Sequence, residues 1–180
     1  GSPGPVVLDA EALRTLASAD GWWDRVTRPC VLTPHAGEFA RLRAGSGHVP
    51  ADDGDLTDDD DARAAAASAA AVEWRQVVVL KGAPTVIAAP DGRVTANPTG
   101  NPGMATAGMG DVLTGAIAAL IAQGLAPYDA ARLSVHAHGM AGDLAESAEG
   151  EGALMPSDLV AHIGDAILEL TAKRKVERSS

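Results

Sequence analysis

Cysteine and aromatic residues are scarce in this chain of 180 residues. The one cysteine, Cys30, has no second cysteine with which to form an intrachain disulfide, and aromatic residues make up 3% of the sequence. Hydrophobic residues nevertheless reach 46%, with alanine and valine dominating, which favours helices packed closely on a parallel sheet over an aromatic-rich sandwich. Because nothing indicates an oxidising compartment, we expect a cytoplasmic protein.

Basic charge and long apolar runs are also limited. Lysine and arginine total 14 against 24 acidic residues, and the net charge of -10 argues against a nucleic-acid-binding surface, although a nucleotide pocket can still be locally positive. The longest apolar stretches fall short of the roughly 20 residues that cross a bilayer, and the N-terminus lacks the basic and apolar regions of a signal peptide. We therefore expect neither a nucleic acid nor a membrane as a partner.

Short apolar segments alternate with helical ones, as in a parallel sheet covered by helices. Strands are predicted at 5–9, 30–33 and 76–80, a hairpin at 85–89 and 93–96, and helices at 10–18, 37–43 and 62–74, the last capped by Asp61. Further helices are expected up to Gly124, from 127 to 148, and from a Ser157 cap to 170, before a polar tail at 173–180. Acidic residues crowd 45–61 and predict a solvated loop, since Asp58 and Ala64 stand where a calcium loop needs glycine and glutamate.

The segment from Asn101 to Gly115, NPGMATAGMGDVLTG, predicts an anion-binding loop that runs into a buried helix. Gly108 and Gly110 let backbone amides turn toward one point, and the helix start adds unpaired N–H groups and the positive end of its dipole. A carboxylate beside a phosphate pocket would repel the ligand unless it has a chemical task. For Asp111 that task would be to accept a proton from an attacking hydroxyl.

Two familiar phosphate motifs do not fit this loop. A Walker motif needs Lys and Ser or Thr where Asp111 and Val112 stand, and a dinucleotide fingerprint needs a third glycine where Leu113 stands. An ordinary glycine-rich turn in which Asp111 caps a core helix remains the alternative.

Three segments would converge at the carboxyl ends of parallel strands, where ligands bind in such sheets. They are 33–38, 81–85 and 107–111. Lys81 would lie near a nucleotide phosphate, or else in water at a strand end. His35 would contact substrate or hydrogen-bond its own loop, and Glu38 reads as a helix-start acid with metal assistance as a second possibility.

The remaining histidines do not predict a metal site. His136 and His138 are two residues apart on a predicted helix, so they do not share a face, and no third ligand is in pattern for zinc. We interpret both, and His162, as core or interface residues.

Four segments together resemble the ADP/ATP-dependent NAD(P)H-hydrate dehydratases, which have a ribokinase-like fold. They are VLDAEAL at 7–13, LTPHAGEFARL at 32–42, VLKGAPT at 79–85 and the 101–115 loop, in the family's order. The resemblance implies a three-layer α/β fold with a mostly parallel sheet flanked by helices. Because the family domain extends upstream of the Val7 strand, we expect residues 1–172 to be its C-terminal part and 173–180 a tail, with activity belonging to the complete domain.

The resemblance also implies a repair reaction. ADP or ATP, with Mg²⁺, would phosphorylate the hydroxyl of the hydrated nicotinamide ring, and loss of phosphate would restore NADH or NADPH. Asp111 would be the catalytic base and, with His35, would contact the hydrated dinucleotide. Nucleotide binding falls to Lys81, Gly82, Ala83, Pro84, Thr85 and Gly110, and the anion hole to the amides of Ala107, Gly108, Met109 and Gly110.

Other interpretations remain open. A ribokinase-like kinase for a hydroxymethylpyrimidine or thiazole is the first, although such kinases usually carry Asp-Pro-Val after the first strand, Thr-Pro-Asn at 33–35 and often Cys at 111, none of which occurs here. A non-catalytic nucleotide-binding fragment is the second. Because part of the family domain lies outside this chain, exposed sheet edges would favour self-association, and we expect a homo-oligomer.

Overall fold

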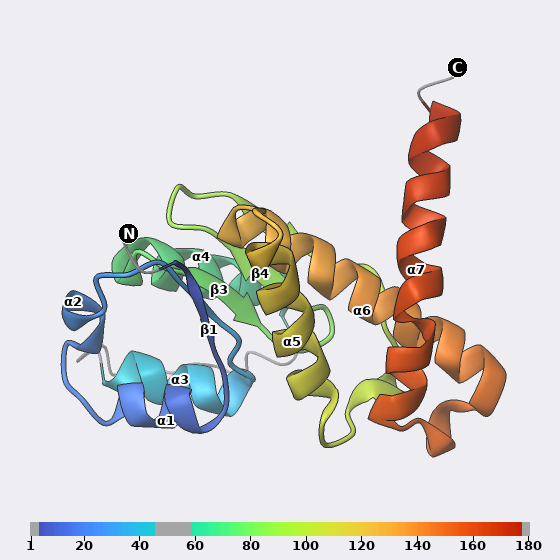
Figure 1. Ribbon diagram of the computed structural model, residues 1–180. Helices are drawn as coiled ribbons and strands as arrows, with labels where there is room; N and C mark the ends of the chain where they lie inside the picture. The colour runs from blue at the N-terminus through green and yellow to red at the C-terminus, as the bar shows by residue number, and fades with distance from the viewer. Residues whose placement is uncertain (1–3, 46–58, 178–180) are drawn as a thin grey trace.

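The computed structural model describes residues 4–45 and 59–177 (Figure 1). Most of the predicted acidic loop, including Asp52, Asp53, Asp55 and Asp58, lies outside these ranges. None of the helices in the two described ranges is both long enough and apolar enough to cross a membrane.

A five-stranded sheet forms the middle layer of the described residues, in the order β1-β2-β3-β4-β5. The strands are β1 (Val6–Leu8), β2 (Cys30–Leu32), β3 (Val77–Leu80), β4 (Val86–Ala88) and β5 (Val94–Ala96). The first three pair in parallel, β4 is antiparallel to β3, and β5 is antiparallel to β4. Because β5 thereby regains the direction of β1 to β3, only β4 is reversed. The expected mostly parallel sheet and the expected hairpin are both confirmed.

One face of the sheet is covered by α1 (Glu11–Ala17), α2 (Trp22–Arg25), α3 (Ala36–Ala44) and α4 (Asp60–Trp74). Alternation along β3 sends Val78 and Leu80 to this side. The aromatic rings gather here: the Trp74 centroid lies 5.0 Å from that of Trp22 and 5.7 Å from that of Phe39. The tryptophans and Phe39 are thus concentrated on this face, whereas Tyr128 packs on the opposite one.

The opposite face is covered by α5 (Met109–Ala122) and α6 (Pro127–Glu149). Val77 and Val79 of β3 point to this side and pack with Ile117 and Val135. A third cluster joins the start of α5 and the second half of α6 to α7 (Pro156–Glu177), whose remainder extends away from the sheet in Figure 1. Single turns η1 (Pro102–Met104) and η2 (Glu151–Ala153) complete the connections. Helices on both faces give the expected three layers.

Two predicted helix starts and one end differ from the structure. The cap of α4 is Asp59, whose side chain accepts the Ala62 N–H at 3.0 Å, because Asp59 has the extended backbone that a cap requires and Asp61 is already helical. Ser157 lies inside α7, and Asp158 instead accepts the Met155 N–H at 2.9 Å. The backbone of α7 continues to Glu177, beyond the expected helix end at 170.

Candidate functional site

The carboxyl ends of β1, β2 and β3 meet around Lys81. Lys81 follows β3, and its Nζ lies 2.9 Å from Oδ1 of Asp9, the residue after β1. Glu38, on α3 after β2, brings its Oε2 to 4.0 Å from the same nitrogen. All three side chains are largely buried, with exposed fractions of 24% for Lys81, 11% for Asp9 and 13% for Glu38. The parallel sheet therefore places one cation between two carboxylates.

Asp9 links this cluster to α5. Its Oδ1 accepts the Ala10 N–H at 2.9 Å, and its Oδ2 accepts the Thr114 hydroxyl at 3.1 Å. Burial would raise the pKa of Asp9, but the hydrogen bond and charge of Lys81, with smaller contributions from Ala10 and Thr33, outweigh it and hold the pKa below its usual value. Asp9 is therefore an anion in the native protein. The sequence interpretation missed it, although the strand-end rule applied to Lys81 would have found it.

His35 is the N-cap of α3. Its Nδ1 accepts the Gly37 N–H at 3.1 Å and the Glu38 N–H at 3.4 Å, while Glu38 Oε2 accepts the His35 N–H at 2.9 Å. These reciprocal bonds form a capping box, so the loop-bonding role considered for His35 is present. The side chain is still 58% exposed, and its Nε2 lies 3.6 Å from Oε2 of Glu38.

The 81–85 loop is a tight turn that is hydrogen-bonded within itself and to Arg63 of α4. Thr85 Oγ1 donates to the Gly82 carbonyl at 2.9 Å and accepts the Gly82 N–H at 3.3 Å. From α4, Nη2 of Arg63 donates to the carbonyls of Lys81 and Pro84, each at 3.3 Å. Arg63 is only 2% exposed, and sequence reasoning gave no sign of it because it lies in an alanine-rich helix.

The glycine loop, residues 101–110, reaches the cluster of Asp9, Glu38 and Lys81 through Gly110. A Cβ at Gly110 would lie 3.3 Å from Asp9 Oδ2 and 3.4 Å from Lys81 Nζ, so the loop backbone sits directly on the ion pair. Gly108 starts α5 with φ of 93°, a conformation that suits glycine. Of the four amides predicted to hold an anion, that of Met109 donates to the Thr106 carbonyl at 3.3 Å. Asp111 is exposed in the first turn of α5.

Two residues of α6, Asp143 and His138, form hydrogen bonds to the glycine loop and the start of α5. Asp143 accepts the Gly100 N–H at 3.0 Å and the Asn101 Nδ2 at 3.1 Å. His138 bonds through Nε2 to the Met109 carbonyl at 3.0 Å. Burial lowers the pKa of His138 below its usual value, and the bond to Met109 offsets this only in part. His138 is therefore a core residue, one of the two roles expected for it.

A cavity of about 850 Å³ lies between the 81–85 loop, the glycine loop and α6. The predicted residues that line it are His35, Lys81, Gly82, Ala83, Pro84, Thr85, Met109 and Gly110. Ala107, Gly108 and Asp111 are not among its lining residues. The whole predicted nucleotide set thus shares one cavity, whereas the predicted base lies beside it, one residue after Gly110.

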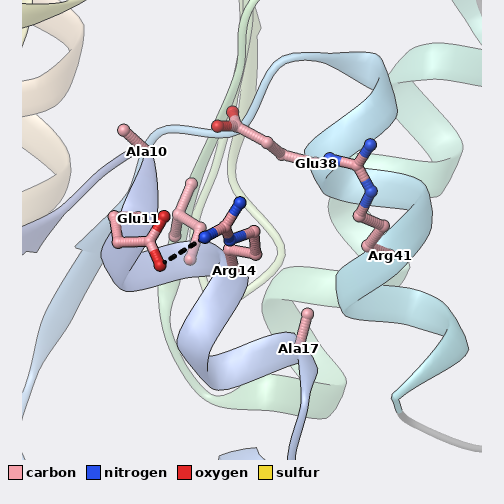
Figure 2. A pocket seen from close by; sticks show the side chains of 7 residues that line it. Ala10, Glu11, Arg14, Ala17, Glu38 and Arg41 are labelled. Atoms are coloured by element: carbon pink, nitrogen blue, oxygen red, sulfur yellow. Dashed lines mark hydrogen bonds and ion pairs between the residues drawn. The ribbon is translucent and has the colours of Figure 1, made fainter.

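A smaller cavity of about 260 Å³ lies between α1 and α3. Figure 2 shows Arg14 and Arg41 facing each other across it, with the Glu38 carboxylate at its upper end near Ala10. Arg14 is paired with Glu11 at 2.8 Å, and both side chains are about two-thirds exposed or more, at 69% and 71%. None of the predicted catalytic, substrate-binding or nucleotide-binding residues lines this groove, so the larger cavity remains the candidate site.

Known proteins similar to this chain include NAD(P)H-hydrate repair enzymes and dehydratases. The sequence profile of the NAD(P)H-hydrate dehydratase family matches residues 2–164. The bifunctional NAD(P)H-hydrate repair enzyme Nnr of Moorella thermoacetica is 49% identical over 156 residues, which cover 87% of this chain and 28% of that protein. The ADP-dependent (S)-NAD(P)H-hydrate dehydratase of Neisseria meningitidis is 40% identical over 150 residues, covering 81% of this chain and 47% of that protein.

A solved structure of similar fold is also a dehydratase. The ADP/ATP-dependent NAD(P)H-hydrate dehydratase of Bacillus subtilis, co-crystallised with ATP and Mg²⁺, matches with a TM-score of 0.76 at 35% identity, covering 92% of this chain and 55% of that one. The chain therefore spans less than half of the two curated relatives and about half of the solved structure.

Proposed function

Because this chain belongs to the NAD(P)H-hydrate dehydratase family, we propose that it supplies the nucleotide site and the base of an enzyme that repairs hydrated NADH and NADPH at the expense of ADP or ATP. The observation that carries the proposal is the shared cavity. His35, the 81–85 loop and Gly110 come from three separate parts of the chain and line one space of about 850 Å³. That space suits a cofactor-sized ligand.

The geometry supports a phosphoryl transfer. A nucleoside phosphate bound along 81–85 would place its phosphates near Lys81 Nζ, and the start of α5 would add amides and a positive dipole. The ring hydroxyl would attack the terminal phosphorus and lose its proton to Asp111. The bond from that phosphorus to the leaving nucleotide would break. Departure of the phosphate from the ring, together with loss of a proton from the neighbouring ring carbon to water, would then restore the double bond of the reduced nicotinamide.

The position of Asp111 fits a base that meets a second ligand. It is exposed and adjoins Gly110, which lines the cavity, so a hydrated dinucleotide could reach it from outside while the nucleotide occupies the interior. His35, exposed at the same edge of the sheet, would contact that dinucleotide. Asp111 and His35 would then act on one side of the transferred phosphoryl group and Lys81 on the other.

Magnesium would neutralise the phosphates. Among residues 4–45 and 59–177 no group of three or more His, Cys, Asp or Glu side chains is arranged to hold a metal by itself. Mg²⁺ commonly takes one or two carboxylates and completes its shell with phosphate oxygens and water. Glu38 lies at the same strand ends, 4.0 Å from Lys81 Nζ, and we propose that its carboxylate assists the metal.

The protein's compartment and assembly are part of the proposal. A single buried thiol, Cys30, agrees with a cytoplasmic location. Self-association is supported by β1, which has one neighbouring strand among the described residues, and by apolar side chains of α7 such as Val160 and Leu168, which are 55% and 66% exposed. Sedimentation analysis over a range of concentrations tests the homo-oligomer.

The activity test follows the absorbance of reduced nicotinamide. Enzymatically hydrated NADH is mixed with ADP, Mg²⁺ and the protein, first as this chain and then as the complete domain. We expect the absorbance to return with the complete domain. A folded complete domain that restores none with ADP and none when ATP replaces it would contradict the proposed dehydratase activity. Calorimetric binding of ADP without turnover would instead support the nucleotide-binding module, and transfer to a hydroxymethylpyrimidine or thiazole would support the kinase.

A further inference from the structure

Arg63 is a buried cation directly beneath the 81–85 loop. Its side chain comes from the first turn of α4 and is 2% exposed, so its charge has been removed from water. Nη2 donates to the carbonyls of Lys81 and Pro84, each at 3.3 Å. One guanidinium nitrogen therefore joins the start of the loop to its far side.

Gly82 of the loop leaves the space that the Arg63 guanidinium occupies. A Cβ at Gly82 would lie 2.2 Å from Nη2 and 2.8 Å from Cζ of Arg63, closer than nonbonded atoms can approach. The planar end of Arg63 thus occupies the space that any side chain at position 82 would need. Because the guanidinium is a rigid, planar group with its donors in fixed directions, it determines where the two loop carbonyls lie.

These contacts affect the cavity without reaching it. Lys81 and Pro84 line the cavity, but Arg63 is not among its lining residues. The backbone of Lys81 also sets the direction of the side chain whose Nζ lies 2.9 Å from Asp9. A shift of the Lys81 carbonyl would therefore move both the loop and the charge that faces the ligand.

We infer that Arg63 is a positioning residue of the nucleotide site, which holds the 81–85 loop in the shape that receives a nucleoside diphosphate. This inference rests on the proposed function for its ligand. A purely structural arginine would affect the stability of α4 and the fold as a whole. A positioning arginine affects the loop and nucleotide affinity beyond any change in stability.

The first test compares charge-removing substitutions on the same helix. Arg63→Gln is compared with Arg75→Gln, because Arg75 is the exposed C-terminal cap of α4 and pairs with Asp24 at the surface. We expect Arg63→Gln to weaken the calorimetric affinity for ADP with Mg²⁺ by about tenfold or more, the effect of losing charged hydrogen bonds. Arg63→Lys should recover part of the loss, and Arg75→Gln should bind as the unmodified chain does.

Amide hydrogen exchange tests the loop without any ligand. Arg63→Gln should speed exchange in 81–85 and leave the β4–β5 hairpin unchanged, whereas Arg75→Gln should change neither. In addition, Gly82→Ala combined with Arg63→Gln should cost less affinity than the sum of the two single changes, because both disturb one contact. If Arg63→Gln does not fold, ADP affinity and amide exchange in 81–85 are measured on Arg63→Lys and on Gly82→Ala instead.

Two results would overturn the role of Arg63. One is wild-type exchange in 81–85 when Arg63 is replaced. The other is ADP binding that is unchanged in a folded Arg63→Gln variant. If the unmodified chain and the complete domain both fail to bind ADP and also fail to bind ATP, the proposed function is wrong. The exchange experiment still decides whether Arg63 holds the loop.

Discussion

Lys81 Nζ lies 2.9 Å from Asp9 Oδ1, which joins the carboxyl ends of β3 and β1, strands separated in the sheet by β2. The pair is largely buried, and Gly110 of the glycine loop lies against it. An internal ion pair costs free energy to desolvate and is strongly destabilising to break, so it is weak support for stability alone. Because Lys81 lies between the strand ends and the glycine loop, its position suits our proposal that it binds the phosphates of a nucleotide.

Lys81→Met should lower the free energy of unfolding by about 1–3 kcal/mol, because Asp9 would lose its charged partner. Asp9→Asn in the same chain should restore part of that stability, since no unpaired charge would remain. Urea denaturation of the wild type, both single variants and the double variant measures the coupling. Additive effects would mean that the two side chains do not interact in solution.

Gly110→Ala should weaken ADP binding by about tenfold, equivalent to about 1.4 kcal/mol, because its Cβ would crowd Asp9 and Lys81. Its stability should change little, since alanine favours a helix over glycine by about 0.5–1 kcal/mol and offsets the crowding. Gly115→Ala, in the same helix with open space around it, is the matched control and should stabilise the protein by that amount without changing affinity. Calorimetry and urea denaturation measure the two effects. Unchanged affinity in Gly110→Ala would place the phosphates elsewhere.

Asp111→Asn should reduce turnover of hydrated NADH in the complete domain by about 100- to 10,000-fold, the usual contribution of a general base. ADP affinity should remain, because Asp111 is outside the lining of the cavity. Asp129→Asn is the control, since Asp129 is likewise an acid in the first turn of a helix. Equal loss of turnover and affinity in Asp111→Asn, together with lower stability, would indicate that Asp111 is only a helix-start residue.

The stability of the protein should fall as the pH drops below about 6.5, the usual pKa of histidine. Burial holds the pKa of His138 lower in the native state, so between the two values the unfolded chain binds more protons than the folded one. Stability attributable to neutral His138 is therefore fully present above the unfolded pKa and is lost as the pH falls toward the native pKa. His138→Gln should lose this part of the slope. Urea denaturation at a series of pH values measures it, and an unchanged slope would mean that His138 is not the titrating group.

Local pattern predicted most of the fold. The apolar runs before Asp9, Thr33 and Lys81 became β1, β2 and β3, and the Pro90-Asp91-Gly92 turn became the connection of the β4–β5 hairpin. Helix caps were harder to predict, because consecutive acids around Asp59 and Asp61 can all accept an N–H. The backbone conformation of Asp59 selects it.

The site was partly predictable. His35, Lys81 and Gly110 each follow an expected strand or begin an expected helix, and the rule for strand ends brings them together. Asp143 and Arg63 carry no local signal. Both lie within helices, and their importance comes from loop atoms far away in sequence, the Gly100 amide and the Lys81 carbonyl.

By itself the sequence determined the order of strands and helices, the glycine loop ahead of α5 and the family to which the chain belongs, because these depend on residue types at short spacing. Only the tertiary structure decided that Asp9 faces Lys81 and that Arg63 lies under Gly82, because these contacts require the sheet order and the packing of α4. It also placed Asp111 beside the cavity rather than within its lining. Charge pairing and steric fit act between atoms close in space, whatever their separation along the chain.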